Sequence, residues 1–191
     1  AEILLKSTEL RYGINKNSIE IIPLLETSYS IANAYKILTV SRRITAVQLG
    51  AEDLTNELGI KRTIQGKEIE YARSVIAHAG NACKIDIIDT PFTHIKDDES
   101  LKRDTMNSKG LGFTGKACIH PRQLSIINEI YTPDFKEVEK ANELLQVFEN
   151  ASNNGKGVCT FEGNMIDKPV ADRARKLVDK ANAILKFKNK R

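Results

Sequence analysis

The chain has 191 residues, a net charge of +4 and 41% hydrophobic residues. This length and composition are typical of one core-bearing domain with a small appendage. The basic residues do not alternate with aromatic ones, as they do on nucleic-acid-binding surfaces. No apolar run approaches the roughly 20 residues that a membrane-spanning helix needs. The composition therefore argues against nucleic acids and membranes as partners.

The three cysteines lie far apart in the sequence, at Cys83, Cys118 and Cys159, and form no C-x-x-C pair. An odd and scattered set of cysteines is typical of free thiols in a reducing compartment. The opening residues show no basic segment followed by an apolar one, which is the pattern of a secretory leader. We therefore expect a cytoplasmic protein.

Strand and helix patterns alternate along most of the chain. Four apolar segments predict strands, at residues 19–25, 44–49, 85–89 and 114–119. Helical patterns follow them at residues 28–40, 66–82, 98–112 and 121–131, and Thr27 or Ser28 can cap the first of these helices. Strands that alternate with helices are the signature of a parallel sheet built from βαβ units.

Two longer helices are expected near the end of the chain, at residues 132–150 and 168–187, with a loop or short hairpin between them. Thr132 is the expected N-cap of the first, with Pro133 in its first turn. The sharpest boundary signal is the turn "SNNGKG" that begins at residue 152. The sequence thus predicts an α/β domain over residues 1–151 and a helical extension over residues 152–191.

Acidic residues end two of the predicted strands. Glu26 follows the run "IIPLL", and Asp53 follows "ITAVQLGAE". In parallel α/β folds ligands sit at the carboxyl ends of the strands, where two neighbouring carboxylates repel unless a cation such as Mg²⁺ lies between them. Alternatively, both acids stand at helix N-termini, where the helix dipole favours them. Spacing alone leaves both interpretations open. Glu52 is expected to face away from Asp53 and to make a structural contact.

Seven segments in chain order resemble one known family: "IIPLLET", "LGAEDL", "RTIQGKEIEYARS", "IIDTPF", "GFTGKACIHPRQ", "YTPDF" and "GNMIDKPV". Together they resemble the citrate lyase β-subunit-like branch of the HpcH/HpaI aldolase superfamily. The resemblance implies a (β/α)₈ barrel and a Mg²⁺-dependent lyase. Such an enzyme cleaves a 3-hydroxy acyl thioester of the citryl, citramalyl or malyl type into a ketoacid and an acetyl thioester. The carrier would be CoA or a carrier protein.

The resemblance also implies roles for individual residues. Glu26 and Asp53 match the family's metal ligands. Asp167 matches an acid/base that lies, in several members, on an extension over the active site of a neighbouring subunit. The alternative role of Asp167 is to cap the helix that starts near Pro169. A homo-oligomer is therefore one expected assembly.

Further residues have two interpretations each. Lys116, His120 and Pro121 follow the last predicted strand, where they would contact substrate or CoA, or would only shape the turn. Arg62 and Arg73 would either shape the site or form salt bridges on helix surfaces.

The family's chains are longer than this one. The resemblance covers residues 20–185 and places them in the C-terminal half of the barrel, as four β/α units with a helical extension. The family's substrate-binding arginine belongs to the first half. An N-terminal half that completes the barrel is therefore an expected partner. The alternative is a non-catalytic homologue that acts as a scaffold or subunit-interface fragment.

Overall fold

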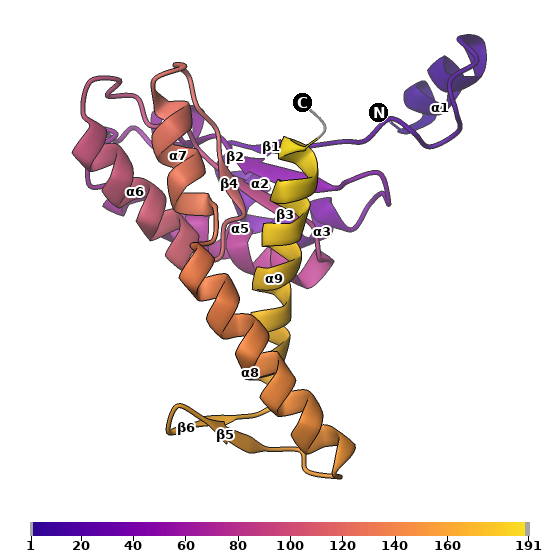
Figure 1. Cartoon of the computed structure of the whole chain (residues 1–191). Helices are drawn as coiled ribbons and strands as arrows, with labels where there is room; N and C mark the ends of the chain where they lie inside the picture. Colours follow the sequence, from indigo (N-terminus) through magenta and orange to yellow (C-terminus); the bar gives the residue numbers. More distant parts are fainter. Residues whose placement is uncertain (1, 190–191) are drawn as a thin grey trace. The chain divides into compact units, whose positions relative to one another are not determined.

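The computed structural model describes residues 2–189 (Figure 1). The chain forms two compact units that divide between Tyr131 and Thr132. The boundary expected at residues 151/152 falls inside helix α8 (Phe135–Asn153). Helix α8 packs along helix α9 (Lys168–Lys188), so that both helices belong to the second unit.

A four-stranded parallel sheet lies at the centre of the first unit, in the order β1-β2-β3-β4. The strands are β1 (Leu24–Leu25), β2 (Ala46–Leu49), β3 (Asp86–Asp89) and β4 (Gly115–Lys116). This arrangement confirms the predicted α/β class. The strands are shorter than the predicted segments. In β1 the reason is Pro23, which has no N–H to donate to the sheet and leaves only an isolated bridge between Ile21 and Ile44 before it.

The helices of the first unit follow the strands in chain order. They are α1 (Glu2–Arg11), α2 (Ser28–Ala32), α3 (Ala34–Leu38), α4 (Ala51–Glu57), the 3₁₀ turn η1 (Lys67–Ile69), α5 (Glu70–Cys83), α6 (Asp98–Gly110) and α7 (Gln123–Tyr131). Thr27 is the N-cap of α2 and forms a capping box with Ser30, as the sequence predicts. Helix α4, which is short, was not predicted from the sequence.

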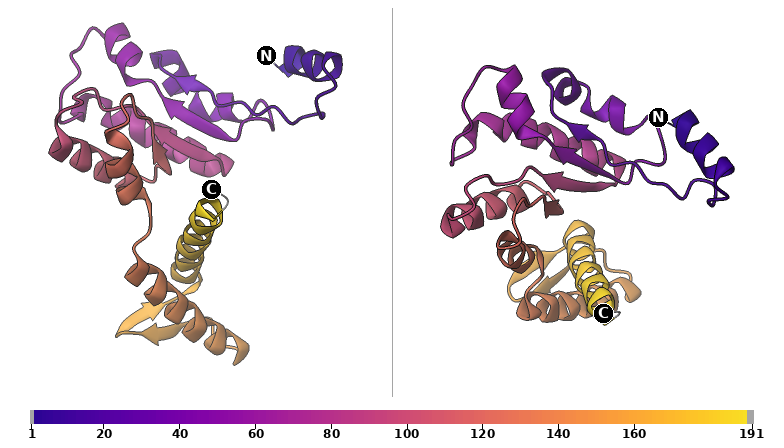
Figure 2. Two further views of the ribbon diagram at one scale, coloured as in Figure 1. Left: turned by 45° about the horizontal axis from the view of Figure 1, so that its top comes forward. Right: turned by 90° about the horizontal axis from the view of Figure 1, so that it is seen from above.

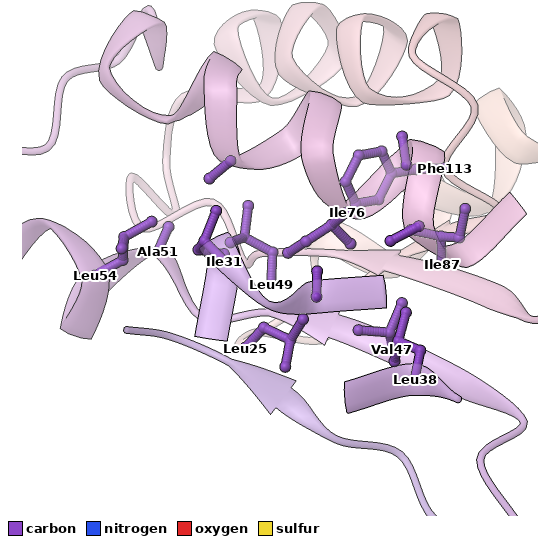
Figure 3. Close-up of a cluster of buried hydrophobic side chains, with 14 of the residues drawn as sticks. Leu25, Ile31, Leu38, Val47, Leu49, Ala51, Leu54, Ile76, Ile87 and Phe113 are labelled. Atoms are coloured by element: carbon purple, nitrogen blue, oxygen red, sulfur yellow. The ribbon is translucent and has the colours of Figure 1, made fainter. Parts of the chain in front are cut away.

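The main hydrophobic core lies between one face of the sheet and the helices α2 to α5 (Figure 3). Alternate strand residues point into it, because successive side chains of a strand face opposite sides. Leu25, Val47, Leu49 and Ile87 are at most 2% exposed. On the opposite face Leu24 is 46% exposed. The described helices of this core therefore leave that face of the sheet uncovered.

The second unit consists of α8, the antiparallel hairpin β5 (Cys159–Phe161) and β6 (Asn164–Ile166), and α9 (Figure 2). Asp134 is the N-cap of α8 and forms a capping box with Glu137, so the prediction of Thr132 as the cap was wrong. The charged Asp134–Glu137 pair satisfies two backbone N–H groups of the helix start at once. None of the helices within residues 2–189 has the length and hydrophobicity required to cross a bilayer.

Candidate functional site

The candidate site lies at the carboxyl ends of the neighbouring strands β1 and β2. Glu26 follows β1 directly, and Asp53 lies in the first turn of α4, which starts two residues after β2. The two strands pair in parallel, with Leu25 opposite Leu49. The structure thus brings together, at the carboxyl ends of these strands, the two acids that the sequence singled out.

The two carboxyl groups interact directly. The pKa of Glu26 is raised, first because the group is partly desolvated and then because of the charge of Asp53 and a hydrogen bond with it. Two neighbouring carboxylates repel one another, which favours the protonated form of Glu26. A cation in the same place would remove this conflict and allow both groups to ionise.

Gly50 permits the close approach of Glu26 to the start of α4. A Cβ atom at position 50 would lie 2.5 Å from the Cβ of Glu26 and 2.8 Å from its Oε2. These distances are shorter than any real contact, so a larger residue would push Glu26 away. Glu57, at the other end of α4, accepts a hydrogen bond from the backbone N–H of Ser28. The helix that carries Asp53 is thus tied to the segment that follows Glu26.

Glu52 turns to a different partner, as the sequence analysis expected. Its Oε1 accepts a hydrogen bond from Nε of Arg62 at 3.0 Å, and Nη1 of Arg62 donates to Glu68. Arg62 lies in the loop before η1 and links α4 to that turn. Of its two predicted roles, the structure shows the salt bridges, although on a loop and not on a helix surface.

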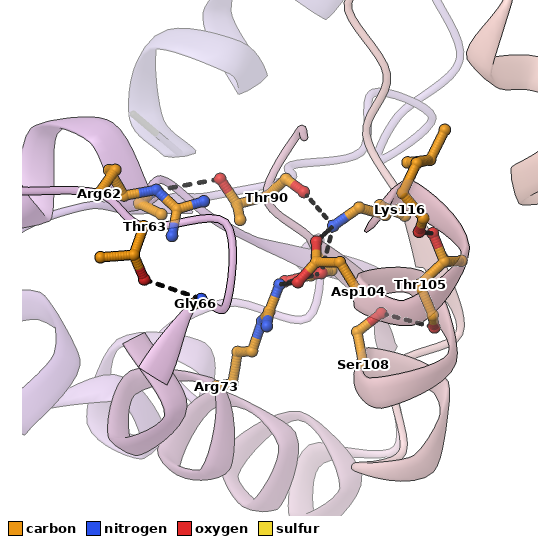
Figure 4. Close-up of polar contacts among 12 residues, drawn as sticks. Arg62, Thr63, Gly66, Arg73, Thr90, Asp104, Thr105, Ser108 and Lys116 are labelled. Atoms are coloured by element: carbon orange, nitrogen blue, oxygen red, sulfur yellow. Dashed lines mark hydrogen bonds and ion pairs between the residues drawn. The ribbon is translucent and has the colours of Figure 1, made fainter. Parts of the chain in front are cut away.

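A buried cluster of four charged side chains lies between the sheet and helices α5 and α6 (Figure 4). Arg73 of α5 makes a two-fold contact with Asp89, from Nε to Oδ1 at 3.0 Å and from Nη2 to Oδ2 at 2.9 Å. The same Nη2 donates to Oδ1 of Asp104 at 2.7 Å. The side chains of Arg73 and Asp89 are 0% exposed, so Arg73 is not on a helix surface.

Lys116 completes this cluster. Its Nζ donates to Oδ2 of Asp89 at 2.6 Å, to Oδ2 of Asp104 at 2.7 Å and to the backbone oxygen of Thr90 at 2.7 Å. An ammonium group has three protons to donate, and here each has a protein acceptor. Burial alone would raise the pKa of Asp104, but Lys116 and Arg73 outweigh it and hold that pKa below its usual range.

The remaining predicted residues each have local contacts of their own. His120 is exposed, and its Nδ1 accepts a hydrogen bond from the backbone N–H of Arg122, while Pro121 lies in the turn before α7. Asp167, in the second unit, is the N-cap of α9, and its Oδ1 accepts from the N–H of Val170 at 3.1 Å. The structure thus shows the capping role of Asp167. Substrate contacts of Lys116, His120 and Pro121 stay predictions.

Asp89, Thr90 and Asp104 were not among the site residues predicted from the sequence. Asp89 ends a predicted strand, as do Glu26 and Asp53, so the same rule could have identified it. Unlike those of Glu26 and Asp53, however, the side chain of Asp89 lies on the face of the sheet where Ile87 enters the core. Asp104 has no signal of its own, because its partners lie 31 and 12 residues away in the sequence.

Comparisons with known proteins identify related sequences. The profile of the HpcH/HpaI aldolase/citrate lyase family matches residues 1–121. The chain is 36% identical to the citrate lyase subunit beta of Leuconostoc mesenteroides subsp. cremoris over 182 residues, which cover 95% of this chain and 60% of the relative. It is 30% identical to the mitochondrial citramalyl-CoA lyase of Rattus norvegicus, covering 94% of this chain and 54% of the relative.

A solved structure is also similar. The protein CitE from Mycobacterium tuberculosis, in complex with magnesium, acetoacetate and coenzyme A, matches with a TM-score of 0.71 and 28% identity. The match covers 85% of this chain and 61% of CitE. This chain therefore spans little more than half the length of the proteins that it resembles.

Proposed function

We propose, since this chain belongs to the HpcH/HpaI aldolase/citrate lyase family, that it is the metal-binding part of a Mg²⁺-dependent carbon–carbon lyase. The substrate would be a 3-hydroxy acyl thioester of the citryl, citramalyl or malyl type, and the products a ketoacid and an acetyl thioester. The observation that carries the proposal is the carboxylate pair, in which Asp53 raises the pKa of Glu26.

The pair fits Mg²⁺ in number and in kind. Mg²⁺ prefers oxygen ligands, and protein sites often supply only one or two carboxylates while water and substrate complete the octahedron. Residues 2–189 contain no group of three or more acidic, His or Cys side chains placed to hold a metal. When bound, Mg²⁺ would polarise the carbonyl oxygen that forms as the carbon–carbon bond breaks. Glu26 and Asp53 would hold it and orient the acid half of the substrate.

Asp167 is the proposed acid/base for the proton transfers. Its carboxylate already accepts the N–H of Val170, which fixes its orientation at the start of α9. One oxygen is thereby used for capping, and the other has the chemistry to exchange a proton with a substrate within hydrogen-bond reach. His120 and Pro121, which follow β4, would line the substrate or CoA entrance. Lys116 would contact substrate only by giving up one of its three partners in the buried cluster.

The arrangement of the sheet supports the proposal that this chain is half of a (β/α)₈ barrel. The strand order follows the chain order, all strands are parallel, and the helices of the main core lie on one face. Within the described residues, β1 and β4 each have one edge without a partner strand. Ile22 and Leu24, at or next to the β1 edge, are 54% and 46% exposed. Edges and apolar faces of this kind are normally covered.

A complementary N-terminal half or a second copy of this chain would cover the free strand edges and the exposed apolar residues. The substrate-binding arginine that the resemblance implies would then come from the N-terminal half. The alternative function is that of a non-catalytic scaffold or interface fragment. The exposed sheet face is compatible with it, whereas the carboxylate pair favours the lyase, because a scaffold gains nothing from two acids in contact.

Calorimetric titration of Mg²⁺ into the chain, with and without oxaloacetate, tests the metal site. We expect binding that oxaloacetate strengthens and that Glu26→Gln or Asp53→Asn abolishes. Glu52→Gln is the matched control, because Glu52 lies in the same helical turn as Asp53 but binds Arg62. Absence of Mg²⁺ binding by the folded chain, or an equal loss in the control, would contradict the proposal and favour the scaffold.

Two substitutions of Asp167 separate catalysis from capping. Asn caps helices about as well as Asp, whereas Ala costs about 1 kcal/mol. We therefore expect Asp167→Asn to leave the melting temperature unchanged and, once the N-terminal half completes the barrel, to abolish cleavage of citramalyl-CoA. Asp167→Ala should lower both. Full turnover by Asp167→Asn would show that Asp167 is only a cap.

A further inference from the structure

The start of helix α4 is capped by Thr90, the residue that follows strand β3. The first N–H groups of a helix have no partner within the helix. The N-cap residue of α4, Gly50, has no side chain to accept them. Instead, Oγ1 of Thr90 accepts the N–H of Ala51 at 3.3 Å. Thr90 is 1% exposed and Ala51 0%, so water does not compete for this bond.

Thr90 is in turn held by the buried charge cluster. It directly follows Asp89, whose carboxylate binds both Arg73 and Lys116. Its own backbone oxygen accepts a hydrogen bond from Nζ of Lys116 at 2.7 Å. Figure 4 shows the ammonium of Lys116 between Thr90 and Asp104. Thr90 is therefore fixed through its backbone, and its hydroxyl is directed at α4.

We propose that Thr90 is a positioning residue for the metal ligand Asp53. The hydroxyl of Thr90 fixes Ala51, and Asp53 lies two residues further along the same helical turn. Loss of this bond would allow the turn to shift relative to Glu26, although neither carboxylate is changed. The inference rests on the proposed function only in that Asp53 is taken as a Mg²⁺ ligand.

The test compares two threonines in the complete chain. Thr90→Val removes the hydroxyl at nearly constant volume. Thr105→Val is the matched control: Thr105 is also buried, at 0% exposure, but its hydroxyl donates within α6 to the oxygen of Leu101 at 2.7 Å. Thr90→Ser keeps the hydroxyl. Mg²⁺ affinity is measured by calorimetry, and hydrogen exchange of the Ala51 amide by NMR.

We expect Thr90→Val to weaken Mg²⁺ binding about 10-fold, as loss of a partner behind a metal ligand generally does. It should also accelerate exchange at Ala51, whereas Thr90→Ser and Thr105→Val should match the wild type in both. Unchanged affinity in Thr90→Val, or an equal loss in Thr105→Val, would overturn the inference. A wild-type chain that binds no Mg²⁺ would contradict the metal site itself. Unchanged exchange at Ala51 in Thr90→Val would overturn the role of Thr90 in either case.

Discussion

Two groups of carboxylates in the first unit differ in what neutralises them. Asp53 helps to raise the pKa of Glu26, and no basic side chain is among the groups that shift it. Asp89 and Asp104 are buried with Arg73 and Lys116, so that two negative charges meet two positive ones. The difference separates the acids that serve the fold from those that we propose to bind an external cation.

Breaking the charge balance of the buried cluster should have the largest effect. Asp89→Asn leaves Arg73 and Lys116 with one carboxylate for two cations. Removal of one partner from a buried ion pair typically costs about 3–5 kcal/mol. We expect a loss of that size in the free energy of unfolding, measured by urea denaturation.

Asp98→Asn is the control for this substitution, because Asp98 pairs with Arg122 where both side chains are substantially exposed. Exposed pairs contribute about 0–1 kcal/mol. An Asp89→Asn variant as stable as Asp98→Asn would show that the cluster is not what holds β3 to α5 and α6.

Crowding the carboxylate pair should have a smaller effect on stability and a selective effect on the metal. In Gly50→Ala the new Cβ would collide with the Cβ of Glu26, and overpacking of this kind costs about 1–3 kcal/mol. We also expect weaker Mg²⁺ binding in calorimetry, because Glu26 must move. Gly115→Ala, in β4, adds the same methyl group where nothing lies within 4 Å. Equal Mg²⁺ affinities in the two variants would contradict the close approach at Gly50.

A third acidic site of the first unit, Glu9, makes the stability of the fold depend on pH. Hydrogen bonds from Arg43, and from the backbone of Asn17 and Ile19, lower the pKa of Glu9 from 4.5 to about 2. The folded state thus releases this proton more readily than the unfolded state. The resulting stabilisation is complete above pH 4.5 and is lost as the pH falls toward 2.

We expect Glu9→Gln to remove this part of the pH dependence, as measured by urea denaturation across that range. The loss should be smaller than that of Asp89→Asn, because Arg43 keeps the oxygens of Ile19 and Asn17 as acceptors. Parallel pH profiles of the wild type and Glu9→Gln would contradict the assignment.

Local features of the fold were predictable from the sequence. The four strand segments, the cap at Thr27 and the α/β class follow from periodicity and turn chemistry, which act over a few residues. The cap at Asp134 was also readable, since Asp134 and Glu137 have the spacing of a capping box. The boundary between the units was not readable, because it depends on the packing of α8 on α9.

For the site, the sequence by itself determined that acids follow the strands, but not which way they point. Glu26 comes one residue after Leu25, whose side chain lies in the core, so the side chain of Glu26 lies on the opposite face of the sheet. Asp89 comes two residues after Ile87, so both side chains lie on the face of the sheet that packs against the helices, because side chains alternate along a strand. Only the tertiary structure supplied the basic partners that decide which acids are neutralised within the protein. Arg73 and Asp104 lie 31 residues apart in the sequence, and their charges meet only when α5 and α6 pack against the same sheet.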